Sequence, residues 1–171
     1  MIQLFILRNN IYWLLLLVII CARVLMSVPD VYAENNITRP VVIYKSPDCG
    51  CCGAWVEHIE DAGFITKIQH SKNLKQIKEQ LGISPMYQAC HTAATMGYVF
   101  EGHVQAEVIQ HFLKAKPDAI GLSVPGMPLG SPGMETDTEF RPYEILQLNK
   151  DGTSTLYARV SSKKIVYFNE K

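Results

Sequence analysis

The sequence predicts a mixed α/β domain behind a hydrophobic leader, and two observations carry this prediction. From residue 41 onward, short β-branched runs alternate with helical patterns, as in β-α units. A cluster of cysteines falls where the first such run ends and the first helical pattern begins. The chain has 171 residues, and its 16 Lys and Arg balance its 16 Asp and Glu. Zero net charge argues against a nucleic-acid-binding protein, which would need a basic face or tail.

The first 33 residues carry the excess hydrophobicity, since 25 of them are apolar. An apolar run from Ile11 to Ala22 follows Arg8, and the segment ends in Val31-Tyr32-Ala33. This order is typical of a secretory signal peptide, which ends in small residues before its cleavage site. An uncleaved anchor is the alternative, but a membrane span needs about 20 apolar residues. We therefore expect residues 1–33 to be a signal peptide and the mature chain, 34–171, to be exported without a membrane span.

The mature chain opens with an expected strand, helix, strand and helix. The β-branched run Val41–Tyr44 predicts a buried strand, and the helical spacing of Trp55, Ile59 and Ala62 predicts the helix that follows. Thiols at the start of the first helix of such a unit are the thioredoxin-like arrangement. The four expected elements are a strand at 41–44, a helix at 53–62, a strand at 64–70 and a helix at 73–82.

The second half of the mature chain adds further strands around one helix. Asp151-Gly152 between two alternating runs predicts a β-hairpin. Gly121 to Gly133 holds four Gly and three Pro, which predicts a long structured loop. By analogy with thioredoxin-like folds, Pro125 or Pro128 would fill the cis-proline position opposite the cysteines. The expected elements are a strand or hairpin at 97–103, a helix at 104–116 and strands at 143–149, 153–160 and 165–168. The fold class is therefore α/β: one domain with a core at about 40–160, comprising a thioredoxin-like βαβα core with a mixed sheet, a long Gly/Pro-rich loop and a C-terminal β-hairpin.

The run Cys49-Gly50-Cys51-Cys52 carries most of the chemistry. Four cysteines in an exported chain usually form two disulfides, but three clustered ones do not fit two loop-closing bridges. Thiolates at a helix N-terminus attack disulfides and bind soft metals. Three interpretations stay open: a metal site, a Cys49/Cys52 redox pair, and a structural disulfide with a spare thiol. Cys51 favours the metal site, because a third thiol would compete for the mixed disulfide of a redox enzyme.

Cys90 is the remaining cysteine of the mature chain, and His91 follows it. Four sulfurs suit a tetrahedral site or several Cu(I) ions that share bridging thiolates. Zinc is the competing ion, but structural zinc sites usually show two spaced C-x-x-C pairs, and the second pair is missing. We therefore expect copper, and zinc is the less favoured metal.

Further candidate ligands lie downstream in the chain. His103 follows a glycine where a strand is expected to give way to a helix, and it is either a ligand or a solvated or helix-capping residue. Met127 and Met134 each follow a glycine in the Gly/Pro-rich region, and both packing and thioether ligation stay open. The other histidines are expected at the surface: His58, His70 and His111.

Four segments together resemble the exported CopG-type copper-resistance proteins. The resemblance covers about Pro40 to Val160, which is nearly the whole mature domain. The segments that carry it are Tyr44-Lys-Ser-Pro-Asp-Cys-Gly-Cys-Cys-Gly-Ala-Trp55, Ala89-Cys-His-Thr92, Gly102-His-Val104 and Val124-Pro-Gly-Met-Pro-Leu-Gly-Ser-Pro-Gly-Met-Glu135.

The resemblance implies a thioredoxin-like fold in the bacterial periplasm and a role in copper tolerance. It also implies a cysteine-bridged multicopper centre and interconversion of Cu(I) and Cu(II). By position the copper ligands would be Cys49, Cys51, Cys52 and Cys90, with additional candidates at His91, His103, Met127 and Met134.

Three functions therefore follow from the sequence. The first is a periplasmic protein that holds Cu(I) and exchanges it with other copper-handling or efflux proteins. The second is a thiol-disulfide oxidoreductase with Cys49 as nucleophile and Cys52 as resolving thiol. The third is a module, stabilised by zinc or a disulfide, that binds another protein.

Overall fold

The computed structural model describes residues 39–161 and 164–168. The chain divides into two units, Met1–Asn36 and Ile37–Lys171, and the described residues belong to the second. The expected signal peptide at 1–33 lies outside the described residues and stays a prediction. Within residues 39–161 and 164–168, every helix is too short or too polar to cross a bilayer.

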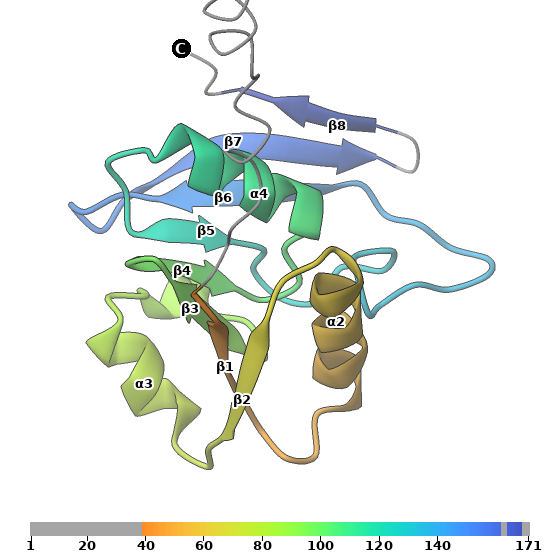
Figure 1. Ribbon diagram of the computed structural model, residues 1–171. Helices are drawn as coiled ribbons and strands as arrows, with labels where there is room; N and C mark the ends of the chain where they lie inside the picture. Colours follow the sequence, from red (N-terminus) through yellow and green to blue (C-terminus); the bar gives the residue numbers. More distant parts are fainter. Residues whose placement is uncertain (1–38, 162–163, 169–171) are drawn as a thin grey trace, which may run out of the picture. The chain divides into compact units, whose positions relative to one another are not determined.

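The second unit is a mixed α/β domain whose element order agrees with the predicted βαβα opening (Figure 1). This order is compatible with a thioredoxin-like core. Its elements are β1 (Val41–Lys45), α2 (Gly50–Asp61), β2 (Thr66–His70), α3 (Leu74–Gln80), the 3-10 helix η1 (Pro85–Tyr87), β3 (Thr92–Thr95), β4 (Tyr98–Glu101), α4 (Ala106–Ala115), β5 (Gly121–Ser123), β6 (Tyr143–Leu148), β7 (Ser154–Ser161) and β8 (Lys164–Tyr167).

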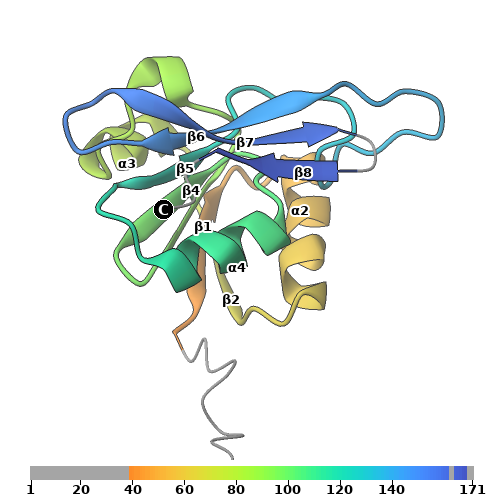
Figure 2. The same cartoon turned by 90° about the horizontal axis from the view of Figure 1, so that it is seen from above.

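The strands form one eight-stranded mixed sheet in the order β2-β1-β3-β4-β5-β6-β7-β8. The pairs β1/β2 and β4/β5 are parallel, and the other five neighbouring pairs are antiparallel. Helices α2 and α4 cover one face of the sheet, and α3 lies on the opposite face (Figure 2). The predicted C-terminal hairpin is the β6/β7 pair, and β8 adds an edge strand to it.

The main core lies between the sheet and the two helices α2 and α4. It is built around the fully buried side chains of Trp55, Phe100 and Phe112. A smaller core, centred on Ile83, lies on the α3 side. Burial of Trp55 and Ile59 from α2 agrees with the helical spacing that predicted this helix.

Two expectations for the Gly/Pro-rich region were wrong. The loop begins later than residue 121, because Gly121–Ser123 forms β5 between β4 and β6. A Cβ atom at position 121 would lie only 1.8 Å from the Val99 carbonyl oxygen, so this glycine permits close strand approach rather than a turn. Neither Pro125 nor Pro128 follows a cis peptide bond, since the described residues contain none.

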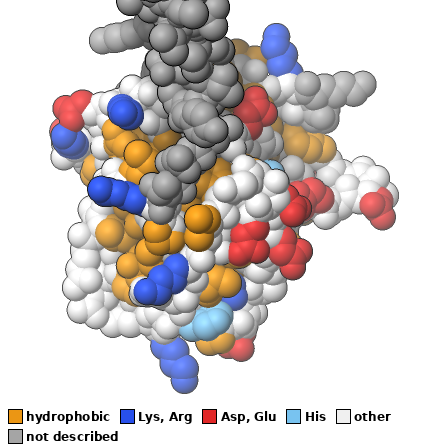
Figure 3. All heavy atoms as spheres, viewed as in Figure 1, with side chains coloured by type: hydrophobic (Ala, Val, Ile, Leu, Met, Phe, Trp, Pro, Cys, Tyr) orange, Lys and Arg blue, Asp and Glu red, His pale blue; other side chains and the backbone are white. Residues whose placement is uncertain are grey.

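One face of the domain is partly apolar at its surface. Figure 3 shows hydrophobic side chains gathered on the face seen in Figure 1, with Lys and Arg side chains among them. Asp and Glu side chains gather on the side of that face near α2. Exposed hydrophobic residues include Ile65 and Ile68, which lie in or beside the edge strand β2.

We expect Gly121→Ala to destabilise the domain by about 3 kcal/mol, because the new methyl group would overlap the β4 backbone. Chemical denaturation of the mature chain measures the effect. Gly53→Ala is the control: its Cβ meets nothing within 4 Å and it lies in α2, so we expect no loss of stability. Equal stability of the Gly121 variant and the wild type would contradict the close approach of β4 and β5.

Candidate metal centre

The first segment of the site is the turn that joins β1 to α2. The backbone N–H of Cys49 donates to the Ser46 carbonyl (3.3 Å), and that of Asp48 donates to the Ser46 hydroxyl (3.4 Å). Helix α2 then begins at Gly50, so Cys49 is its N-cap and Cys51 lies in its first turn. The amides of a first helical turn lack helical partners and carry the positive end of the helix dipole, which favours thiolates.

The structure brings the four cysteines of the mature chain together. The sulfur atoms of Cys49, Cys51, Cys52 and Cys90 all lie within 4.8 Å of one another. Cys49 and Cys52 form a disulfide, and Cys51 and Cys90 are free. The Cys51 sulfur lies 3.6 Å from that of Cys49. The cluster therefore holds one disulfide and two thiols.

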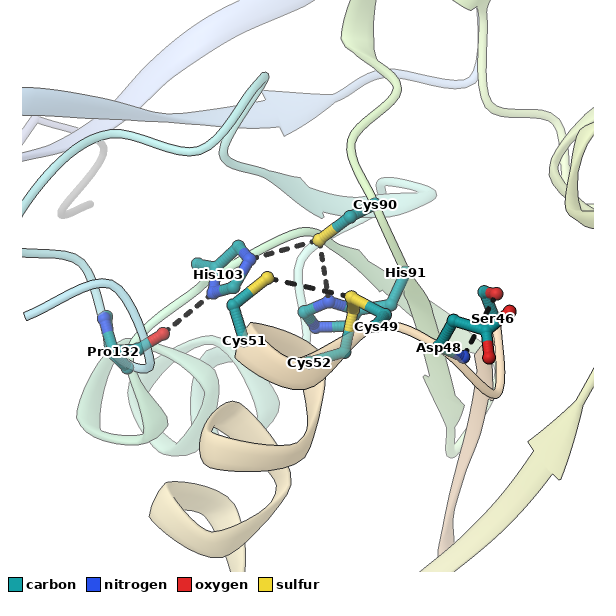
Figure 4. Close-up of a disulfide and its surroundings, with 9 residues drawn as sticks. All are labelled: Ser46, Asp48, Cys49, Cys51, Cys52, Cys90, His91, His103 and Pro132. Carbon is teal, nitrogen blue, oxygen red and sulfur yellow. Dashed lines mark hydrogen bonds between the residues drawn. A yellow bond between two sulfur atoms is a disulfide. The ribbon is translucent and has the colours of Figure 1, made fainter.

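Cys90 also belongs to a second group, which it forms with two histidines (Figure 4). Its sulfur lies 3.0 Å from Nε2 of His103 and 3.3 Å from Nδ1 of His91. Both histidines are fully buried. Cys90 is thus shared by a four-sulfur group and a Cys-His-His group.

His103 is held in one tautomer by the Gly/Pro-rich loop. Its Nδ1 lies 2.7 Å from the Pro132 carbonyl, which can only accept, so Nδ1 carries the proton. Nε2 is then unprotonated and directs its lone pair toward Cys90, as in a metal-binding histidine. Burial lowers the pKa of His103, which keeps the ring neutral. A solvated His103, one of the two alternatives from the sequence, is excluded.

His91 packs against the aromatic core beneath the thiols. Its ring centroid lies 4.3 Å from that of Trp55, whose indole N–H donates to the Val104 carbonyl (2.8 Å). Burial, and next the proximity of His103 and of the Lys78 ammonium, lowers the pKa of His91 well below its ordinary value. Its Nε2 is buried without a hydrogen-bond partner. A neutral His91 therefore presents Nδ1 to Cys90.

The Gly/Pro-rich loop packs directly on the first turns of α2. Gly133 has a φ of +79°, and a Cβ atom there would lie 2.6 Å from the Cys51 carbonyl oxygen and 2.8 Å from the Trp55 nitrogen. Only glycine fits this position without strain. The close contact places the neighbouring Pro132 carbonyl where His103 can reach it.

The two candidate methionines belong to this same loop. The side chain of Met127 is exposed, whereas Met134 is half-buried and its N–H donates to the Ser131 carbonyl (2.8 Å). Thioether ligation by either residue stays a prediction.

The remaining histidines are less exposed than the sequence predicted. His70 is exposed, as expected. His58 is half-buried and accepts the Ala106 N–H (3.0 Å) at the start of α4, and burial lowers its pKa. His111 is half-buried, with Nδ1 2.7 Å from the Tyr157 hydroxyl. The surface prediction was wrong for these two because each satisfies a polar group between packed elements.

Some residues beside the site were not found from the sequence. Lys78 and Glu101 form a buried ion pair next to the Cys90 segment. The sequence did contain a signal for Glu101, because it is a charged residue at the end of an apolar strand, directly before Gly102-His103. The carbonyl of Pro132 offered none, because any residue has one.

Burial, and next the neighbouring Cys51, raises the pKa of the Cys90 thiol to about 12. Cys90 is therefore a neutral thiol at pH 7 in the absence of metal. A metal ion that bound Cys90 would displace a proton, whereas the neutral imidazoles of His91 and His103 could bind one without releasing a proton.

Fold and site together define a mixed α/β protein with a Cys/His cluster suited to a soft metal. The family described as "Protein of unknown function, DUF411" matches residues 87–134. No curated protein matches the chain significantly.

Two solved structures are similar over most of the domain. The one titled "Copper resistance protein copG- Form 2" is 32% identical with a TM-score of 0.68, and the match covers 72% of this chain and 98% of that one. Form 1 of the same protein is 33% identical with a TM-score of 0.67, over 71% and 96% of the two chains. The chain therefore belongs to the CopG copper-resistance family, in agreement with the resemblance of its four motifs.

We expect alkylation of Cys90 by iodoacetamide to speed up about tenfold per pH unit between about pH 7 and 10. The reason is that a pKa of about 12 leaves the thiolate a small fraction throughout this range. Peptide mass spectrometry of the metal-free, non-reduced protein measures the rate, with glutathione in the same tube as the ordinary thiol. A Cys90 rate that levels off together with glutathione would contradict the raised pKa.

Proposed function

We propose that the mature chain is a periplasmic copper-binding protein of copper resistance that holds Cu(I) through Cys49, Cys51, Cys52 and Cys90. The observation that carries this proposal is the approach of all four sulfurs to within 4.8 Å of one another. Cu(I) is a soft ion that prefers thiolate and thioether ligands. Membership of a copper-resistance family supports copper over zinc.

The number of donors favours more than one copper ion. Four sulfurs and two neutral imidazoles exceed what a single Cu(I) uses, and Cys90 lies in both groups. A bridging thiolate at Cys90 would link an ion among the cysteines to one beside His91 and His103. Met127 and Met134 would add thioether ligands from the loop.

The Cys49–Cys52 disulfide couples copper binding to the oxidation state of this cysteine pair. In the disulfide form Cys51 and Cys90 remain as thiols. When the pair is reduced, two Cu(II) ions can each take one electron from the Cys49 and Cys52 thiols. The products are two Cu(I) ions and the disulfide, and the thiol protons pass to solvent. The reverse reaction returns two electrons from two Cu(I) ions to the disulfide.

The predicted signal peptide supports a periplasmic location, where thiols and copper both meet oxidants. There the protein would receive or deliver copper ions, and other copper-handling or efflux proteins are the proposed partners.

A thiol-disulfide oxidoreductase is the second candidate, and the Cys49–Cys52 disulfide at a helix N-terminus favours it. Cys51 argues against it, because its sulfur lies 3.6 Å from that of Cys49 and would compete for a mixed disulfide. Catalysis of insulin reduction distinguishes this candidate from the copper protein.

We expect the fully reduced mature chain to bind more than one equivalent of Cu(I), and the disulfide form to bind fewer. Cys51→Ser should lower the stoichiometry of the reduced form, because it removes a sulfur from the centre of the cluster. Anaerobic titration against a chromophoric Cu(I) chelator measures both. His70→Ala, which changes an exposed histidine on β2, is the control and should bind as the wild type does.

Absence of Cu(I) binding, or binding unchanged by Cys51→Ser, combined with normal insulin reduction would support the oxidoreductase instead. Metal analysis of protein from copper-supplemented cells separates copper from zinc in the same preparation.

We also expect the reduced, metal-free chain to convert Cu(II) to Cu(I) as Cys49 and Cys52 become a disulfide. Two Cu(I) ions should form per disulfide in a single anaerobic turnover, because each Cu(II) accepts one electron. A Cu(I)-specific chelator counts the ions, and mass spectrometry counts the disulfides. Cys52→Ser should abolish the Cys49–Cys52 bond, so Cu(I) formed at the wild-type yield in this variant would contradict the assignment of the pair.

A further inference from the structure

A buried ion pair lies beneath the Cys90 segment on the α3 side of the sheet. Lys78 is the one buried residue of α3, and its ammonium group contacts the fully buried Glu101 carboxylate at the end of β4. The other ion pairs among the described residues, such as Arg159–Glu144, have exposed side chains. Removing two charges from water costs several kcal/mol each, so such a pair gives little net stability over apolar packing.

The Glu101 carboxylate binds the chain on both sides of Cys90 and His91. One oxygen accepts the backbone N–H of Ala89 (2.6 Å), and the other accepts the hydroxyl of Thr92 (2.5 Å). The Thr92 oxygen in turn accepts a hydrogen bond from the Lys78 ammonium (2.9 Å). Ala89 immediately precedes Cys90, and Thr92 immediately follows His91.

The same strand end leads to the second histidine. Glu101 is followed by Gly102, whose N–H donates to the His91 carbonyl (2.9 Å), and then by His103. A Cβ at Gly102 would lie 2.6 Å from that of Ala89, so the two segments are in close contact. One carboxylate therefore fixes the spacing between the two chain segments that present Cys90, His91 and His103.

We infer that Lys78, Glu101 and Thr92, here termed the Glu101 clamp, position the Cys90, His91 and His103 donors for metal. The inference rests on the proposed copper function. The clamp residues are positioning residues, since they bind the backbone beside the donors rather than the metal. Partners that orient metal ligands typically change metal affinity by about 10- to 100-fold when they are removed.

The test replaces the clamp by the double variant Lys78→Met/Glu101→Met, which leaves no unpaired charge buried. In the metal-free disulfide form we expect the Ala89 amide to exchange with deuterium about tenfold faster than in the wild type, because its acceptor is gone. NMR of the full mature chain measures this exchange.

Metal binding gives the second readout. Cu(I) alone and Co(II) alone are titrated into the disulfide form, where Cys51, Cys90 and the two histidines remain as donors. We expect the double variant to lose about tenfold in Cu(I) affinity and to shift the thiolate-to-Co(II) charge-transfer band.

Thr92→Val is the milder variant. It should also speed up exchange of the Ala89 amide and lower the Cu(I) affinity. Its matched control is Thr95→Val on the same strand, since Thr95 is buried and its hydroxyl has no hydrogen-bond partner. The control should leave Ala89 exchange, Cu(I) affinity and the Co(II) band unchanged.

A folded double variant that melts at a lower temperature but keeps the wild-type affinity and band would show a role in stability alone and overturn the inference. If the double variant does not fold, Thr92→Val decides by the same criteria. If only the fully reduced form of the wild type binds metal, the affinities and bands are compared in that form. If neither form of the wild type binds metal, the copper proposal fails, and Ala89 exchange decides whether the clamp holds the segment: faster exchange supports it and unchanged exchange overturns it.

Discussion

The antiparallel pairing of β3 with both β1 and β4 determines where every donor of the site lies. Thr92 is in register with Tyr44 of β1 and with Glu101 of β4. The end of β1, the start of β3 and the end of β4 therefore meet at one edge of the sheet. Because β5 runs parallel to β4, the loop that carries Pro132 leaves from this edge as well. Strand pairing therefore brings the cysteine turn, Cys90-His91, His103 and the loop together, and the donors then contact one another directly.

This constraint explains what the sequence could predict and what it could not. The helices and most strands carry their own periodicity, so the pattern of Trp55 and Ile59 was enough to place α2. The β5 strand was missed because Gly121 is a turn signal in sequence, and its role appears only when Val99 of the neighbouring strand is in place. A three-residue strand has too little periodicity to outweigh a glycine.

The candidate site was predictable to the extent that unusual residues mark it. Clustered thiols identified Cys49, Cys51 and Cys52, and Cys90 followed as the remaining cysteine of the mature chain. The burial of His103 could not be inferred, because its partner is a backbone carbonyl 29 residues away in the chain. The half-burial of His58 and His111 likewise depends on partners in other elements, Ala106 and Tyr157.

The position of Cys90 connects these features to the chemistry. Its thiol is protonated in the metal-free state, the two imidazoles beside it are neutral, and two of the neighbouring sulfurs are in a disulfide. The Cys90, His91 and His103 group is therefore uncharged in the metal-free state, which suits the full burial of its two histidines. Under the proposed function, a copper ion would replace a proton at Cys90, and reduction of the disulfide would supply two further sulfur ligands. Because the Cys90 sulfur lies within 4.8 Å of the Cys49 and Cys52 sulfurs and also contacts His91 and His103, a change between disulfide and thiols in the cysteine turn would act directly beside both histidines.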